Sequence, residues 1–304
     1  MNDIQKIATE NRIEQALNVD FTGYEKYLSL LDIAENTRKH YIRKVKDFIE
    51  FVNIHGFNRF SFLAYKKHIS TVNAWSVGTK NQYLNSARVL CKAMAFQGVI
   101  PDITQNVKGF KDTRKHKKQG LNLSEMGEIK KIFDEIDTRS KAILTLLTYQ
   151  GLRQIEVNRL DVEDINTHAG TAFIQGKGQD GKELIYLHSE TLEILKQYIT
   201  EYNIKSGALF FSLSNNGKNK RLSTRSIRKI IKSIFGKAGI NDDKTTHGLR
   251  HFFVTELIKA FNGNPFKVKA LSRHKSTEML LVYNDEITQQ KDLKKYQSCF
   301  QNIL

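Results

Sequence analysis

The chain has 304 residues, of which 40% are apolar and 26% charged, and only 2 are prolines. This composition is typical of folded domains and excludes collagen-like, mucin-like and largely disordered chains, and the length favours two domains. Lys and Arg number 48 against 32 Asp and Glu, which leaves a net charge of +16. A polyanion, either nucleic acid or an anionic membrane surface, is therefore the first partner to consider.

The cysteines and the apolar stretches indicate the compartment. Cys91 and Cys299 are the only cysteines, so neither a disulfide framework nor a four-cysteine zinc site can form. No run of 18 apolar residues occurs, and the first six residues lack the apolar core of a signal peptide. We therefore expect a soluble, cytoplasmic protein with no membrane partner.

The first part of the chain predicts a small helical bundle. Residues 1–20 are polar and lack an apolar period, which predicts a tail. From residue 21 apolar side chains recur every three or four positions, which is typical of amphipathic helices. Four helices in residues 21–105 would form one domain. They are expected after residue 21, after an N-cap at Asn36 or Thr37, and near residues 61–72 and 78–96.

A basic segment, residues 106–120, marks the domain boundary. It contains almost no apolar side chains, and Asp112 is its only acidic residue. A solvated linker and a linker that follows a phosphate backbone explain this charge run equally well. Its basic residues are Lys108, Lys111, Arg114, Lys115, Lys117 and Lys118.

The second domain, residues 121–284, mixes helical and strand patterns. Asn122 and Glu125 have the spacing of a helix capping box. Two alternating runs flank the glycine-rich turn 176–181, which predicts a β-hairpin. The expected fold is mainly α, with an α-rich α+β second domain that contains a small antiparallel sheet. Helices are expected from the cap at Asn122 through the apolar stripe 129–136, and over residues 141–150, 189–202, 224–236, 247–261, 266–271 and 277–284, followed by a polar tail at 285–304.

Two segments of the second domain carry arginines suited to binding phosphate. Arg153 follows an apolar helix and Gly151, and Glu156, three residues later, could hold its guanidinium in place. An ordinary surface ion pair has the same spacing. His247 and Arg250 are also three residues apart and so point the same way on a helix.

Two histidine patterns occur in the second domain. His247 and His251 have the spacing of zinc ligands on a helix, but no Glu follows the first His and Arg250 would oppose a dication, so we expect no metal there. His274 precedes Tyr283 by nine residues, which would place them on opposite faces of one helix. Ser276 can cap a helix that begins after His274, so the two side chains can converge. Taken alone, Tyr283 would be a packing residue.

Together these motifs resemble the tyrosine recombinase (phage-integrase-type) family. The matching elements are Gly-Leu-Arg-x-x-Glu at 151–156, Gly-Lys-Gly at 176–178, His-x-x-Arg-His at 247–251, His274 and Tyr283. The resemblance implies a SAM-like core-binding domain at 21–105 and a catalytic domain at 121–284. Two departures are Arg273, where the family commonly has Gly, and the run Met-Leu-Leu-Val at 279–282, where it has small and β-branched residues.

The resemblance implies a site-specific DNA recombinase that cuts and rejoins strands through a 3′-phosphotyrosyl intermediate. Two arginines suit the charge that develops on the phosphate, and neither a carboxylate cluster for Mg²⁺ nor a P-loop is apparent, so no metal or other cofactor is expected. The implied roles are phosphate binding for Arg153, Arg250 and His274, proton transfer for His247, protonation of the leaving oxygen for Lys177 or else Lys182, orientation for Glu156, and nucleophilic attack for Tyr283.

Duplex DNA with inverted-repeat half-sites is the implied partner, bound by a homotetramer or by a heterotetramer with a paralogue, in association with a bacterial nucleoid. The tail 285–304 could dock on a neighbouring protomer or fold back. Only about twenty residues precede the first domain, which favours an Xer-like recombinase or a compact integrase or resolvase of a mobile element. Candidate DNA contacts are Lys80, Arg88, Lys115, Lys117, Arg225, Arg228 and Lys229.

Two other functions fit the same scaffold. One is a DNA-binding regulator that has lost cleavage, which the presence of all the reacting residues disfavours. The other is a type IB topoisomerase-like relaxase, which would use the same chemistry on a single duplex and would relax supercoils without site dependence.

Overall fold

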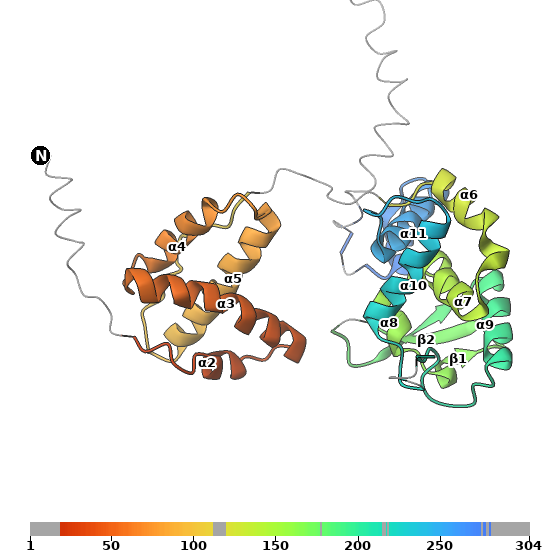
Figure 1. Cartoon of the computed structure of the whole chain (residues 1–304), viewed down its shortest axis with the longest axis horizontal. Coiled ribbons are helices and arrows are strands. Elements are labelled where there is room, and N and C mark those ends of the chain that lie inside the picture. Colours follow the sequence, from red (N-terminus) through yellow and green to blue (C-terminus); the bar gives the residue numbers. More distant parts are fainter. Residues whose placement is uncertain are drawn as a thin grey trace, which may run out of the picture. The chain divides into compact units, whose positions relative to one another are not determined.

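The computed structural model describes residues 19–111, 120–176, 178–214, 217, 219–274, 276–277 and 280. The chain divides into two compact units, the first ending at Arg114 and the second beginning at Lys115, and each has its own apolar core (Figure 1). Within the described residues, no helix is both long and apolar enough to cross a membrane. The predicted C-terminal tail, Lys115, Lys117, Lys177 and Tyr283 lie outside the described residues.

The first unit is the predicted bundle of helices. Its centre is aromatic, because the rings of Phe48, Phe62 and Tyr65 are fully buried and pack edge to face or nearly so. The hydroxyl of Tyr65 donates a 2.7 Å hydrogen bond to Asp47, which satisfies its polar atom inside the core. The helices are α2 (Glu25–Ser29), α3 (Glu35–His55), α4 (Ser61–Ser70) and α5 (Val77–Phe96).

The start of α3 differs from the prediction. The helix begins at Glu35 after Ala34, which forms no side-chain cap, so the predicted N-cap at Asn36 or Thr37 is wrong. Arg38 in the first turn explains the difference, because it pairs with Glu35 and donates to the carbonyls of Leu28 and Leu31 at 3.1 and 2.9 Å. These contacts with the preceding segment hold the helix start where a capping side chain is missing.

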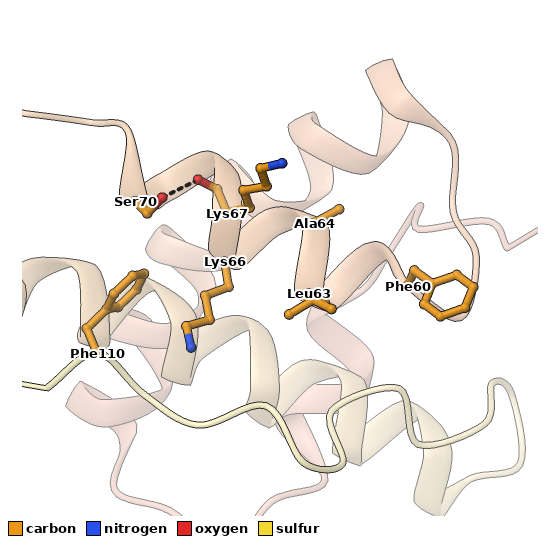
Figure 2. A pocket seen from close by; sticks show the side chains of 7 residues that line it. All are labelled: Phe60, Leu63, Ala64, Lys66, Lys67, Ser70 and Phe110. Carbon is orange, nitrogen blue, oxygen red and sulfur yellow. Dashed lines mark hydrogen bonds between the residues drawn. The ribbon is translucent and has the colours of Figure 1, made fainter. Parts of the chain in front are cut away.

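The start of the predicted linker packs onto the first unit. Phe110 and Asn81 exchange two hydrogen bonds of 2.8 and 2.9 Å, and Arg88 donates to the carbonyl of Val107 at 2.6 Å. Figure 2 shows Phe110 beside α4, where Lys66 lies 5.4 Å from the centre of its ring. The packed part of the first unit therefore continues past residue 105 to Phe110.

The second unit surrounds a buried helix, α7 (Thr138–Tyr149), and a small sheet. The strands β1 (Ile165–Asn166), β2 (Thr171–Gln175) and β3 (Lys182–Tyr186) are antiparallel in that order. The hairpin of β2 and β3 is as predicted, whereas β1 is too short to give an alternating pattern. The other helices are α6 (Leu123–Lys131), α8 (Gln154–Arg159), α9 (Ser189–Glu201), α10 (Thr224–Lys237), α11 (Thr246–Ala260) and α12 (Pro265–Ser272).

The capping box that opens the second unit is confirmed. The backbone N–H of Glu125 donates to Asn122 Oδ1 and that of Asn122 donates to Glu125 Oε2, both at 2.8 Å. The apolar stripe 129–136 is not one helix, because α6 ends at Lys131 and a short 3-10 turn, Phe133–Glu135, follows.

Candidate active site

The turn between α7 and α8 places Arg153. Gly151 in this turn has a φ of +56°, and a Cβ at this position would lie 2.2 Å from the ring of Phe253. Only glycine fits both the backbone conformation and the space. The chain thus reverses sharply at the end of the buried helix and presents Arg153 directly before α8.

Arg153 and Glu156 form the predicted pair, but in a different setting. Arg153 is the N-cap residue of α8, and its backbone N–H donates to Glu156 Oε2 at 2.8 Å while its Nη1 donates to Oε1 at 2.7 Å. Glu156 is 1% exposed, so the pair is not an ordinary surface contact. Among the described residues nothing else binds the guanidinium of Arg153, whose side chain is 34% exposed. Its remaining N–H groups can therefore receive a ligand.

Arg250 ties three elements together. It projects from α11, is 2% exposed, and donates from Nη1 to the carbonyl of Gly151 at 2.5 Å and from Nη2 to that of Ser272 at 2.6 Å. The first carbonyl belongs to the turn that carries Arg153, and the second lies two residues before His274. Residues 153, 250 and 274 are far apart in sequence, and the fold brings them into one cluster.

The two histidines of α11, His247 and His251, differ in their surroundings. His247 is exposed one turn before Arg250. His251 instead packs on Gly120, where an added Cβ would meet its ring at 2.2 Å, and its Nδ1 lies 3.4 Å from Thr255 Oγ1. Within the described residues, no three His, Cys, Asp or Glu side chains are grouped so that they could hold a metal ion.

His274 is buried in a neutral form whose hydrogen-bond network defines its tautomer. Ser272 Oγ donates its only proton to the carbonyl of Val268 at 2.6 Å, so it must accept the Nδ1–H of His274, 2.7 Å away. Burial, followed by the charges of Arg250, Arg153, Arg273 and His247, lowers the pKa of His274 to about 4. At neutral pH its Nε2 therefore carries no proton.

Arg273 is the functional neighbour that the sequence did not fully reveal. The sequence marks it only as a departure from the family's Gly, whereas in the structure its Nη2 donates to Glu156 Oε2 and its Nη1 to the carbonyl of Gln150, both at 3.3 Å. Burial acts to raise the pKa of Glu156, but the Arg153 N–H and the guanidinium groups of Arg273 and Arg153 outweigh it and hold that pKa below its usual value. The basic residue in place of the family's Gly was the available signal.

Leu280 anchors the chain shortly before position 283. Its side chain is 1% exposed and packs with Val254 and Ile258 of α11 and with Val268 of α12. The chain three residues before Tyr283 is thus fixed to the same two helices that carry Arg250 and lead to His274.

Of the two candidate lysines of the hairpin, Lys182 lies within the described residues. Lys182 Nζ lies 2.5 Å from Asp164 Oδ1, a carboxylate that is almost completely buried. Arg159 of α8 donates to the carbonyl of Gly176 at 2.9 Å and so holds the start of the turn that contains Lys177. Lys182 is therefore engaged in an ion pair at the start of β3, next to the turn.

The candidate DNA contacts fall into two groups. Arg225, Arg228 and Lys229 are exposed on α10, whose opposite face is buried in the core. In the first unit, Lys80 donates to the carbonyl of Ser70 and Arg88 binds Asn85 and Val107, so both have partners within the protein.

Comparisons with known proteins agree with this geometry. The model of the phage integrase family matches residues 121–290. A tyrosine recombinase of Synechocystis sp. is 33% identical over 149 residues, which are 48% of this chain and 48% of the relative. The chain thus spans about half the length of the curated relatives that it matches.

Two solved structures share the fold. The XerH site-specific recombinase, in a post-cleavage complex with palindromic difH substrate, has a TM-score of 0.70 and 19% identity, covering 85% of this chain and 79% of that one. A lambda integrase tetramer bound to a Holliday junction has a TM-score of 0.66 and 16% identity, covering 86% and 74%. At these identities the likeness shows a common fold.

Proposed function

Because the chain belongs to the phage integrase family, we propose that it is a site-specific DNA recombinase that cuts and rejoins strands through a 3′-phosphotyrosyl intermediate at Tyr283. The convergence of Arg153, Arg250 and His274 on one cluster, in which only Arg153 is partly exposed, is the observation that carries this proposal. These residues come from three elements and have in common the ability to bind a phosphodiester.

The arginines would stabilise the transition state. Attack on a phosphodiester adds negative charge to its non-bridging oxygens, and a fixed guanidinium binds such oxygens with two parallel donors. Arg153 has N–H groups available for this purpose, whereas both terminal nitrogens of Arg250 donate to backbone carbonyls, so Arg250 would contribute its positive charge from beneath the same turn. Both are held by hydrogen bonds before substrate arrives, so little reorganisation is needed.

Proton transfer would be divided among three residues. The phenol of Tyr283 must lose its proton, and His247, exposed one turn from Arg250, is suited to accept it. Lys177 would protonate the leaving 5′-oxygen, and the ion pair of Lys182 with Asp164 supports Lys177 over Lys182. His274 must gain a proton at Nε2 before it can donate to a phosphate oxygen, and the phosphate anion would favour that protonation.

Duplex DNA with inverted-repeat half-sites would be the substrate, bound by a tetramer of identical chains or of this chain and a paralogue. The XerH and lambda integrase complexes support a DNA partner and a multimeric assembly. The exposed Arg225, Arg228 and Lys229 on α10 would contact the DNA backbone. We place the protein in a bacterial cytoplasm, acting at the nucleoid as an Xer-like recombinase or a mobile-element integrase.

A nicked suicide substrate tests this proposal. The parent protein should form a denaturation-resistant adduct with DNA, Tyr283→Phe should form none, and Tyr149→Phe should form it normally. Tyr149 is a suitable control because it lies at the end of α7, close in sequence to Arg153, with its ring stacked on His188. An adduct that persists in Tyr283→Phe, or a parent protein that forms none, would refute the proposed function. Supercoil relaxation without site dependence would favour the topoisomerase-like alternative.

A further inference from the structure

Arg273 occupies a backbone conformation that ordinarily favours glycine. It follows α12 with φ 56° and ψ 41°, the left-handed region that side chains other than glycine, asparagine and aspartate rarely adopt. An arginine persists in this conformation when the contacts of its side chain compensate for the backbone. The side-chain contacts of Arg273 therefore offset the cost of its backbone conformation.

Those contacts join two parts of the candidate active site. Nη2 of Arg273 donates to the carboxylate that also binds Arg153, and Nη1 donates to the carbonyl of Gln150 in the turn before Arg153. Glu156 is thus the common acceptor for Arg153 and Arg273. The residue after Arg273 is His274. The side chain of Arg273 therefore connects the segment that carries His274 with the turn that carries Arg153.

Arg273 is poorly placed to bind the substrate itself. Its side chain is 7% exposed, and both terminal nitrogens are directed at protein acceptors. Arg153, which shares the same carboxylate, is five times more exposed. The two arginines therefore differ in role, with Arg153 facing the ligand and Arg273 lying behind it.

We propose that Arg273 is a positioning residue for strand transfer, which fixes Arg153 through Glu156 and ties the loop of His274 to the turn at Gln150. This inference rests on the proposed function. Arg153 and Arg273 both bind the carboxylate of Glu156, so the orientation of Arg153 depends on the contact between Arg273 and that carboxylate. Its removal should leave the fold intact, because glycine adopts the left-handed conformation at no steric cost.

The variant Arg273→Gly tests the inference on the suicide substrate. We expect a single-turnover rate of adduct formation at least tenfold below that of the parent, with DNA affinity within about threefold. Arg273→Lys, which keeps the charge but has no planar fork, should recover part of the rate. Asn262→Gly is a matched control, because Asn262 also has a positive φ, of 50°, but is exposed in the loop after α11. An Arg273→Gly variant as fast as the parent would overturn the inference.

A double-mutant cycle with Glu156→Gln separates positioning from a general structural effect. If Arg273 acts through Glu156, its loss should slow the reaction by less than about twofold once Glu156→Gln is present. Effects that multiply independently would refute action through Glu156. Thermal unfolding of each variant, recorded in parallel, identifies any loss of folded protein.

Amide hydrogen exchange gives a readout that does not need activity. The backbone N–H of Arg153 bonds to Glu156, and it should exchange at least tenfold faster in Arg273→Gly than in the parent. The N–H of Asn122 makes the equivalent bond to Glu125 in α6 and should be unchanged. If the parent forms no adduct, but exchange at Arg153 is still faster in Arg273→Gly than in the parent, the proposed function is refuted and the positioning contact is not. Unchanged exchange at Arg153 would refute the contact itself.

Discussion

The buried neutral state of His274 makes the stability of the second unit depend on pH. Its pKa is about 4 in the folded protein against an ordinary value of 6.5, because it is buried and because Arg250, Arg153, Arg273 and His247 lie around it. The unfolded chain therefore binds the proton more tightly than the folded one. This contribution to stability is complete above about pH 6.5 and is lost as pH falls toward 4.

The size of the effect follows from the two pKa values. Linkage gives a loss of about 2 kcal/mol of unfolding free energy between pH 7 and pH 5, and of about 3 kcal/mol by pH 4. The side chain is 6% exposed, so solvent screens it little. Other groups also titrate below pH 5. Their contribution to the pH dependence is subtracted with a variant that keeps the hydrogen bond to Ser272 but has no titrating side chain at position 274. His274→Asn is such a variant, because its amide N–H can replace Nδ1–H.

The assay must report on the second unit alone. Trp75 is the only tryptophan, and it lies in the first unit, so fluorescence would follow the wrong domain. Amide hydrogen exchange in the buried helix α7, corrected for the intrinsic pH dependence of exchange, measures the relevant opening free energy. We expect the parent to lose about 2 kcal/mol more than His274→Asn between pH 7 and pH 5. Equal losses in the two proteins, or an imidazole pKa near 6.5 by NMR, would refute this reasoning.

Three further predictions concern single sites. Gly151→Ala should cost about 2–4 kcal/mol of unfolding free energy, measured by the same exchange assay, and Phe253→Leu should recover part of that loss by making room for the methyl group. Lys177→Ala should slow cleavage by about 100-fold or more. A substrate with a 5′-bridging phosphorothiolate, whose sulfur leaves without a proton, should restore the cleavage rate of this variant. The same substrate should not restore the rate of Lys182→Ala. Asn122→Ala should cost about 1 kcal/mol of unfolding free energy in the same exchange assay, and a loss below about 0.3 kcal/mol would contradict the role of the cap.

The parts of the fold that sequence predicts well are those determined by neighbouring residues. The apolar period indicates α5 and α11 almost to their ends, and the pair Asn122 and Glu125 predicts its own hydrogen bonds. Each of these signals lies within a few residues of the structure that it specifies. The start of α3 shows the limit, because Arg38 reaches back to the carbonyl of Leu28 and overrides the nearby capping candidates.

The candidate site shows the same limit. Motif spacing identifies Arg153, Arg250 and His274 as candidates, but not that Arg250 binds the carbonyls of Gly151 and Ser272. Those bonds join segments 99 and 22 residues away, and no local pattern encodes them. The pairing of Arg273 with Glu156 spans 117 residues and depends on a left-handed backbone that an arginine does not itself predict.

The charges of the cluster explain why these contacts matter together. Arg153 and Arg273 share the carboxylate of Glu156, Arg250 binds two backbone carbonyls, and Glu183 adds an electrostatic attraction to Arg273. Buried cations are costly unless anions or carbonyl oxygens surround them, and here backbone carbonyls supply part of that compensation. A fourth cation at His274 is disfavoured for the same reason, and its pKa is low accordingly. A phosphodiester would supply the missing anion, so the positive charge that makes the cluster costly would also give it affinity for the proposed DNA substrate.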